Sequence, residues 1–170
     1  MADKSFEIEE KAKSLSLVNR LFARKSLKGL ASALADDEPV VALAVGTYGN
    51  WAGLLCCTDR QLLILQKRML GGARVERFPF EKISSVEHGA LLGFGKLTIN
   101  AGGHRSTITQ IATAELNPFL EALEAQRARY AHATPSSATY VEQLERLAKL
   151  HDAGALSAEE FVAAKSRLLV

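Results

Sequence analysis

The chain has 170 residues, of which 48% are hydrophobic and 24% are charged, and its formal net charge is +2. This length and apolar content suit one globular domain with a small appendage, and so mild a charge by itself gives no support for nucleic-acid or membrane binding. The sequence has no long uncharged apolar run and no signal-peptide core near its N-terminus, so neither a transmembrane helix nor secretion is expected. Two adjacent cysteines, Cys56 and Cys57, predict reduced structural thiols and a cytoplasmic chain.

Residues 1–37 are predicted to form one amphipathic helix, which ends before Pro39 because proline cannot continue a helix. One side of this helix is apolar at helical spacing, with Leu15, Val18, Leu21 and Phe22, and after a drift the apolar stripe continues with Leu27, Leu30 and Leu34. The other side is basic, with Lys11, Lys13, Arg20, Arg24, Lys25 and Lys28. Two interpretations remain open: the helix lies on the rest of the domain with a solvated basic face, or it contacts an anionic surface as interfacial helices do.

The middle of the chain is organised around a hairpin whose turn is Thr58-Asp59-Arg60. The strand that follows this turn, Leu62–Leu65, is apolar on both faces and is expected to be buried on both. Short strand patterns with turn signals between them predict an all-β barrel or sandwich. The seven predicted strands span residues 40–47, 54–57, 62–65, 74–78, 83–87, 96–100 and 105–109.

After the strands, the hydrophobic period changes from two residues to that of a helix. This helix is expected to begin near Thr113, to run to about Tyr130 and to close one open end of the barrel. Its apolar face consists of Leu116, Phe119, Leu120 and Leu123. Residues 133–138, with Pro135 among small polar residues, read as a flexible linker.

Residues 139–170 are predicted to form a helical hairpin. Gly154 suits the left-handed position after the first helix, and Ser157–Glu160 has the spacing of a capping box for the second. Two short helices leave apolar surface uncovered, which is typical of an interaction site. The candidate interface residues are Val141, Leu144, Leu147, Leu150, Phe161, Val162, Leu168 and Leu169.

The tail closely resembles the short C-terminal domain called SHOCT, which occurs in bacterial and archaeal proteins. The resemblance covers residues 140–169. It is carried by the Leu144/Leu147/Leu150 ladder, His151-Asp152-Ala153-Gly154, Leu156, the Ser157–Glu160 box, Phe161, Lys165 and Leu168.

The preceding region, which we delimit as residues 38–132, resembles the bacterial pleckstrin-homology-like (PH-like) family. The resemblance is carried by Leu54–Leu65 with its turn, by residues 80–86, by Gly95 and by the closing helix. It implies an α+β fold: a seven-stranded PH-like barrel of two packed sheets closed by a C-terminal helix, here preceded by an N-terminal helix and followed by the hairpin. It does not imply phosphoinositide binding, because the basic lipid motif of eukaryotic PH domains is absent from the sequence.

We find no catalytic signature. Cys56 and Cys57 are neighbours on a strand, so their side chains point to opposite faces and cannot readily share a metal ion. The glycines between Ala90 and Leu97 superficially resemble a phosphate loop, but that loop needs glycine at the first of these positions and serine or threonine at the second. No two of the histidines have metal-ligand spacing; they are His88, His104, His132 and His151. We therefore predict no enzyme activity, no metal, no cofactor and no small-molecule substrate.

The sequence favours a non-enzymatic bacterial interaction or scaffold protein, with the barrel as a recognition platform and the tail for oligomerisation or binding to a protein partner. The alternative is a peripheral membrane or anionic-lipid-binding module that uses the basic N-terminal helix. A polyanion or lipid surface would involve basic residues, while neighbouring glutamates favour an ordinary solvated surface. The basic candidates are Arg20, Arg24, Lys25, Lys28, Lys67, Arg68 and Arg74.

Overall fold

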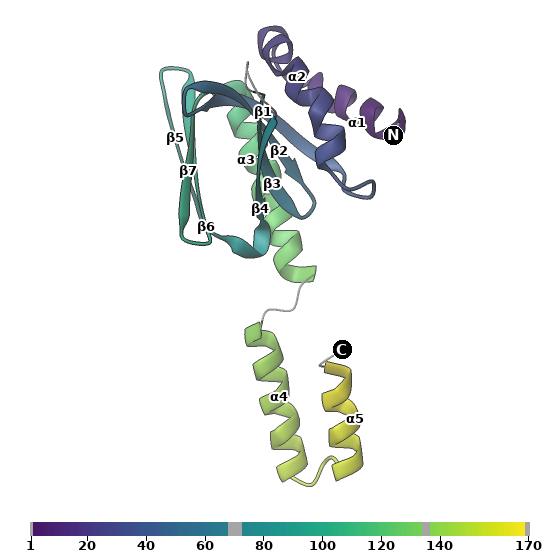
Figure 1. The fold of residues 1–170 in the computed structure, drawn as a ribbon. Coiled ribbons are helices and arrows are strands. Elements are labelled where there is room, and N and C mark those ends of the chain that lie inside the picture. The colour runs from purple at the N-terminus through teal and green to yellow at the C-terminus, as the bar shows by residue number, and fades with distance from the viewer. Residues whose placement is uncertain (1, 68–72, 134–136, 169–170) are drawn as a thin grey trace. The chain divides into compact units, whose positions relative to one another are not determined.

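The computed structural model describes residues 2–67, 73–133 and 137–168. The chain divides into two compact units, residues 1–130 and residues 131–170 (Figure 1). No helix in the described ranges is both long enough and apolar enough to cross a membrane.

The seven predicted strands are confirmed, and they form one antiparallel sheet in the order β4-β3-β2-β1-β7-β6-β5. The sheet is open rather than the predicted closed barrel, because its edges β4 and β5 have no hydrogen-bonded pairing with each other among the described residues. Pro79 ends β4 without a backbone donor, and the short 3₁₀ turn η1 (Phe80–Lys82) leads the chain to the other edge. The strands are β1 Val40–Tyr48, β2 Trp51–Thr58, β3 Gln61–Lys67, β4 Ala73–Pro79, β5 Ile83–Leu91, β6 Phe94–Ala101 and β7 His104–Ala112.

Strands β1, β2 and β3 are buried on both faces, as their continuous apolar runs predict. On one face, Leu55 and Ile64 belong to a core that also contains residues of β5, β6, β7 and the helix α3 (Thr113–Ala133). On the opposite face, Leu54 and Leu63 belong to a second core completed by two N-terminal helices. The sheet therefore has two hydrophobic cores, one on each side.

The predicted single N-terminal helix is wrong, because the structure has two helices, α1 (Ala2–Ala12) and α2 (Leu17–Ala33). The helical conformation is interrupted before Ser16. The hydroxyl of Ser16 accepts a 3.2 Å hydrogen bond from Asn19 N and caps α2. The break changes the helical phase, so an apolar stripe counted from Leu15 does not continue into the first half of α2. Of the predicted stripe, Leu15, Leu30 and Leu34 enter the second core, together with Ile8, Ala12 and Ala23. Val18, Leu21 and Phe22 are exposed, so the stripe is wrong for these three.

The helix α3 presents the predicted face to the first core, where Leu116, Phe119, Leu120 and Leu123 are buried. Gly95 of β6 provides room for this contact. A Cβ atom built at Gly95 would lie 2.1 Å from Leu116 Cδ2, well inside the limit for non-bonded atoms. The close approach of helix and strand therefore depends on a residue without a side chain.

The second unit contains a helical hairpin, α4 (Ser137–Asp152) and α5 (Ala158–Leu168). Gly154 has φ +69° after α4, and the hydrogen bonds Ala155 N to Leu150 O and Gly154 N to His151 O, both 2.9 Å, form a Schellman motif. At the start of α5 the predicted capping box is confirmed: Glu160 N donates to Ser157 Oγ at 3.2 Å and Ser157 N donates to Glu160 Oε2 at 2.9 Å. Of the predicted linker, residues 134–136 lie outside the described ranges.

Candidate interaction surfaces

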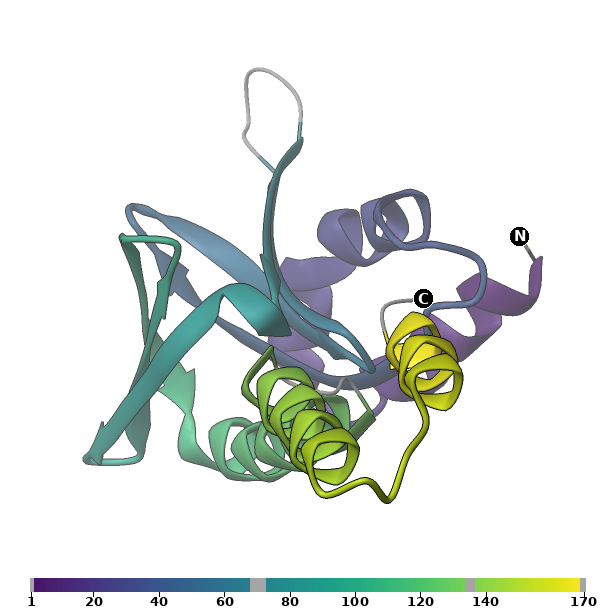
Figure 2. The ribbon, with the colours of Figure 1, turned by 90° about the horizontal axis from the view of Figure 1, so that it is seen from below.

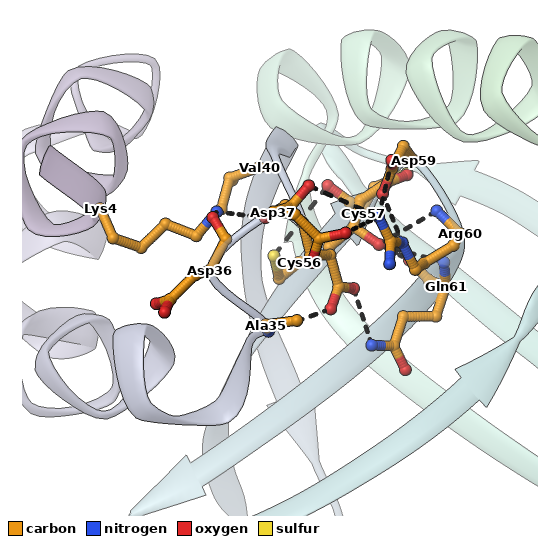
Figure 3. A network of polar contacts seen from close by, with 12 residues as sticks. Lys4, Ala35, Asp36, Asp37, Val40, Cys56, Cys57, Asp59, Arg60 and Gln61 are labelled. Carbon is orange, nitrogen blue, oxygen red and sulfur yellow. Dashed lines mark hydrogen bonds and ion pairs between the residues drawn. The ribbon is translucent and has the colours of Figure 1, made fainter. Parts of the chain in front are cut away.

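A network of charged side chains attaches the N-terminal helices to the sheet (Figure 3). Lys4 is buried, donates to the backbone oxygen of Glu38 and pairs with Glu7 at 3.3 Å. Glu7 accepts a 2.6 Å hydrogen bond from Val40 N, and the buried carboxylate of Glu38 accepts a 2.7 Å bond from Gln61 Nε2. Since each of these groups has partners within the fold, the network serves structure and offers no vacant ligand position.

The hairpin turn between β2 and β3 extends this network. Arg60 donates to the carboxylates of Asp59 at 3.1 Å and Asp37 at 3.2 Å, so the turn is joined to the segment before β1. Thr58 Oγ1 accepts from Gln61 N at 3.0 Å within the same turn. Through its contact with Asp37, Arg60 fixes the turn to the chain that enters the sheet.

The two thiols are held apart in the two cores. Cys56 lies in the core with the N-terminal helices and Cys57 in the core with α3, as alternation along a strand requires. Burial raises the pKa of Cys56 well above its usual value and, with a smaller contribution from the charge of Asp59, raises the pKa of Cys57 to about 12. Both thiols are therefore protonated and unreactive at neutral pH. Within the described ranges, no three His, Cys, Asp or Glu side chains lie where they could hold a metal ion.

A hollow of about 600 Å³ lies between β4 and the β6–β7 turn, on the face of the sheet that carries Tyr48. Tyr48 donates a 2.7 Å hydrogen bond to Glu76 Oε2, and the guanidinium of Arg74 lies 5.9 Å from the centre of the Tyr48 ring. Arg74 also pairs with Glu76, and Arg105 pairs with Glu87 at 3.0 Å. The remaining lining includes Arg77, Phe78, Pro79, Lys82, His104 and Ser106. Two of the basic groups in the lining are therefore each paired with a glutamate, and a third, Arg77, donates to Ala33 O of α2 at 2.9 Å.

The basic residues predicted to form one anionic-ligand surface do not come together. The side chains of Arg20, Arg24, Lys25 and Lys28 are exposed on α2, which covers one face of the sheet. Arg74 lies over Tyr48, which packs against the core on the other face. Arg68 lies outside the described residues, as does the side chain of Lys67. The sheet therefore separates Arg74 from the α2 cluster, and binding of an anionic ligand by these residues stays a prediction.

Sequence reasoning missed the β5–β6 turn, where Leu91, Leu92 and Phe94 are exposed. The signal was the leucine itself, because the first position of a two-residue turn between paired strands normally holds Asn, Asp or Gly, and here Leu92 precedes Gly93. The glycines around this turn superficially resemble a phosphate loop, whereas the apolar side chains between them match no binding motif. Together with the exposed face of α2, this turn makes an apolar surface on the first unit.

In the tail hairpin, the predicted interface residues are incompletely covered by their own two helices. Leu144, Leu147 and Phe161 are half-buried, while Leu150 is 43% and Val162 is 62% exposed. The ring of His151 lies against Phe161 with centroids 5.0 Å apart, which joins α4 to α5. Leu169 lies outside the described residues, as do the side chains of Val141 and Leu168. The described seam is therefore a shallow contact rather than a core.

The first unit is thus an open seven-stranded antiparallel sheet with a helix packed into one core, and the second unit contains a small helical hairpin. Residues 34–125, more than half of the chain, match the family described as Bacterial PH domain, and the chain belongs to this family. Residues 142–169 match the family described as Short C-terminal domain, or SHOCT. Both resemblances stated from the sequence are confirmed.

Two solved structures are similar to this chain. The pleckstrin homology domain from Shewanella amazonensis SB2B is 18% identical with a TM-score of 0.40, and the match covers 63% of this chain and 96% of that one. A DUF1696 family protein with a pleckstrin-homology domain from Shewanella loihica PV-4 is 14% identical with a TM-score of 0.39, covering 64% and 95%. None of the curated proteins compared with this chain matches it.

Proposed function

We propose that this chain is a non-enzymatic interaction protein that assembles through its tail hairpin, with the PH-like unit as a recognition platform. The observation that carries the proposal is the incomplete burial of the hairpin. Among the described side chains of residues 144–166, none is buried to the degree of a core residue. A unit this small seldom folds alone without a disulfide, a metal or a partner, and both cysteines of the chain lie in the sheet.

The ends of the hairpin helices support this proposal. The Schellman motif at Gly154 and the capping box at Ser157 satisfy backbone groups that would otherwise lack partners. The turn is therefore well specified, and what the hairpin lacks is a cover for its apolar surface. Leu150 and Val162 are the large apolar side chains left exposed among its described residues, and a second copy of the same hairpin offers a matching apolar surface.

The recognition role of the PH-like unit is supported by the hollow beside Tyr48. Its rim carries Arg74, Lys82 and Arg105, of which Arg74 is paired with Glu76 and Arg105 with Glu87. An acidic segment of a protein partner would place its carboxylates near these cations, and Tyr48 and Phe78 would supply apolar contact. We therefore propose an acidic peptide segment as the class of ligand for the platform.

Light scattering on three proteins tests the tail: the full chain, a chain ending at Ala133 and the full chain with Val162→Glu. We expect a multiple of the monomer mass for the full chain and the monomer mass for the other two. Ala163→Glu is the matched control, because it adds the same charge on the same helix without removing a large apolar side chain. A monomeric full chain that recovers no partner in a pull-down would contradict assembly through the hairpin.

A further inference from the structure

Exposed apolar side chains of the first unit gather on two segments that are distant in sequence. One is the first half of α2, where Leu21 is 72% and Phe22 is 70% exposed; the other is the β5–β6 turn, where Leu91 is 77% and Leu92 is 90% exposed. Apart from Phe6 and Trp51, every large apolar side chain that is exposed among the described residues of this unit belongs to these segments. The complete set, which we call the apolar rim, is Leu17, Val18, Leu21, Phe22, Leu91, Leu92 and Phe94.

The first turn of α3 joins the two segments. Thr113 donates from its backbone N to Gly93 O at 3.0 Å and from its hydroxyl to the same oxygen at 3.2 Å, which fixes the β5–β6 turn. Two residues further along, Glu115 accepts hydrogen bonds from Ser16 N at 2.9 Å and Asn19 Nδ2 at 2.8 Å, which fixes the start of α2. Both segments of the apolar rim are therefore held by the first turn of α3. They lie at the end of this unit where α3 begins, at the top of Figure 1.

A groove of about 490 Å³ lies between the two segments, and its lining includes Phe22 from one and Phe94 from the other. Its floor includes Val45 and Ala52 of the sheet. Because side chains from both segments line one groove, the two segments form a continuous surface. Figure 2 shows this unit from below, with α2 on one side of strands β1 and β2 and α3 on the other.

Leu92 occupies a turn position whose backbone conformation is unfavourable for leucine. Its φ is +52°, in the left-handed region that costs leucine about 1–2 kcal/mol relative to a right-handed conformation. Asn and Gly tolerate this conformation, and a leucine that is 90% exposed gains little from burial in return. Departures from local preference of this kind concentrate at functional sites.

Unpaired positive charge borders the apolar rim. The helix α2 has no acidic residue and carries Arg20, Arg24, Lys25 and Lys28 on its exposed surface, and Lys96 lies beside Leu91 and Phe94. Unlike Arg60, which pairs with Asp59, and Arg105, which pairs with Glu87, none of these five cations forms an ion pair with a described residue. Along the outward side of α2, the apolar side chains come first and the cations Arg24, Lys25 and Lys28 follow.

We propose that the apolar rim and these cations dock the first unit onto the surface of an anionic lipid bilayer. A helix with apolar side chains beside basic ones and no acidic residue is the pattern of interfacial membrane binding, and each Lys or Arg near an anionic leaflet strengthens binding about fivefold. Leu17–Ala33 precedes the residues that match the Bacterial PH domain family, so this surface belongs to the N-terminal extension and the β5–β6 turn. The proposal is independent of the tail and goes beyond the assembly proposed above.

Vesicle flotation with the full chain tests the proposal, using phosphatidylcholine vesicles with and without phosphatidylglycerol. We expect binding to the anionic vesicles alone at about 0.1 M salt, and its loss near 1 M salt, where the Debye length falls from about 10 Å to about 3 Å. No binding to the anionic vesicles at the lower salt concentration would overturn the proposal.

Three variants separate apolar contact from charge. Leu92→Asn keeps the turn, because asparagine tolerates the positive φ, and Leu21→Gln keeps a helix former at an exposed position. Each is expected to weaken binding about tenfold, given the free energy of burying a leucine. The triple change Arg24→Gln, Lys25→Gln and Lys28→Gln is expected to abolish binding at 0.1 M salt. Phe6→Gln is the matched control, since Phe6 is equally exposed but lies on α1, and it should bind as the unchanged chain does.

Leu92→Cys provides a direct probe of insertion. Both native thiols are fully buried, so an environment-sensitive fluorophore should label the new cysteine alone. A blue shift on addition of anionic vesicles is expected. Binding that both leucine variants leave unchanged, or a labelled turn whose emission does not shift, would reduce the contact to charge alone and overturn the role of the rim. A dimer in solution that Leu92→Asn dissociates, without vesicle binding, would assign the rim to a second copy.

Discussion

Glu115, in the first turn of α3, accepts a 2.8 Å hydrogen bond from the side chain of Asn19 in α2. The same carboxylate accepts from Ser16 N at 2.9 Å and from Val45 N of β1 at 3.2 Å. One buried acidic group therefore ties the start of α2, the start of α3 and the centre of the sheet. Because the N-terminal helices lie outside the matched PH region, this contact attaches an extension to the domain.

Glu115→Ala is expected to lower the free energy of unfolding by about 2–4 kcal/mol, because the N–H groups of Ser16, Asn19 and Val45 lose their charged acceptor. Denaturant unfolding measures the change. Glu121→Ala, on the exposed side of the same helix, is the control and should stay within about 0.5 kcal/mol of the unchanged chain. Equal effects of the two changes would show that Glu115 does not hold the helices to the sheet.

Phe119→Ala should cost about 3–5 kcal/mol, as other large-to-small changes in cores do. Phe119 is 1% exposed and lies in the core that α3 shares with the sheet, so the change leaves a cavity between helix and strands. Thermal and denaturant unfolding provide the measurement. Ala125→Gly, on the exposed side of α3, is the control and should lower the free energy of unfolding by about 1 kcal/mol. Near-unchanged stability of Phe119→Ala would contradict a helix that is packed into the core.

The native thiols are expected to resist a thiol-reactive dye at neutral pH. Burial raises the pKa of Cys56 well above its usual value and that of Cys57 to about 12, so the thiolate that reacts is scarce and inaccessible. In the native chain we expect reaction only at the rate of unfolding, and in denaturant both cysteines should react promptly. Rapid reaction of either thiol in the folded chain would show that one core opens readily.

The start of α5 should lose helical structure in acid. In the capped helix the pKa of Glu160 is lowered, first by the hydrogen bond from Ser157 N and then by the Ser157 side chain. A carboxylate whose pKa is lower in the folded state contributes stability above its unfolded pKa of about 4.3, and this stability is lost as the pH falls through the folded value. Chemical shifts of residues 158–161 followed from about pH 6 to about pH 3 provide the measurement.

Glu160→Gln is the control for this titration, because the amide accepts the same backbone hydrogen bond without titrating. The acid-induced change should be absent in this variant and reduced in Ser157→Ala, which removes one of the two hydrogen bonds. The same loss of structure in Glu160→Gln would assign the acid sensitivity to another group.

Features that depend on near neighbours in the chain could be predicted well from the sequence. The capping box at Ser157, the left-handed residue at Gly154, the seven strands and the buried face of α3 all follow from dihedral preferences, side-chain hydrogen bonds and hydrophobic period. These act over a few residues, so the contacts that satisfy them are already present in the local sequence.

Only the tertiary structure decided which side of α2 faces the sheet. Leu21 and Phe22 looked like core residues by spacing, but the break at Ser16 and the hydrogen bond from Asn19 to Glu115 rotate them outward. Ala23 is buried in addition to the predicted Leu30. The partner that fixes this rotation lies 96 residues away, and no local period encodes it.

The open sheet and the apolar rim were decided in the same way. Pairing of β4 with β5 depends on how far the whole sheet twists and on the turn at Phe80–Lys82, and the nearness of Phe22 to Phe94 depends on α3 joining two distant segments. The sequence by itself therefore determined the elements, their caps and the families they resemble. The tertiary structure determined which apolar side chains remain exposed, because burial is set by contacts between elements and not by the pattern within any one of them.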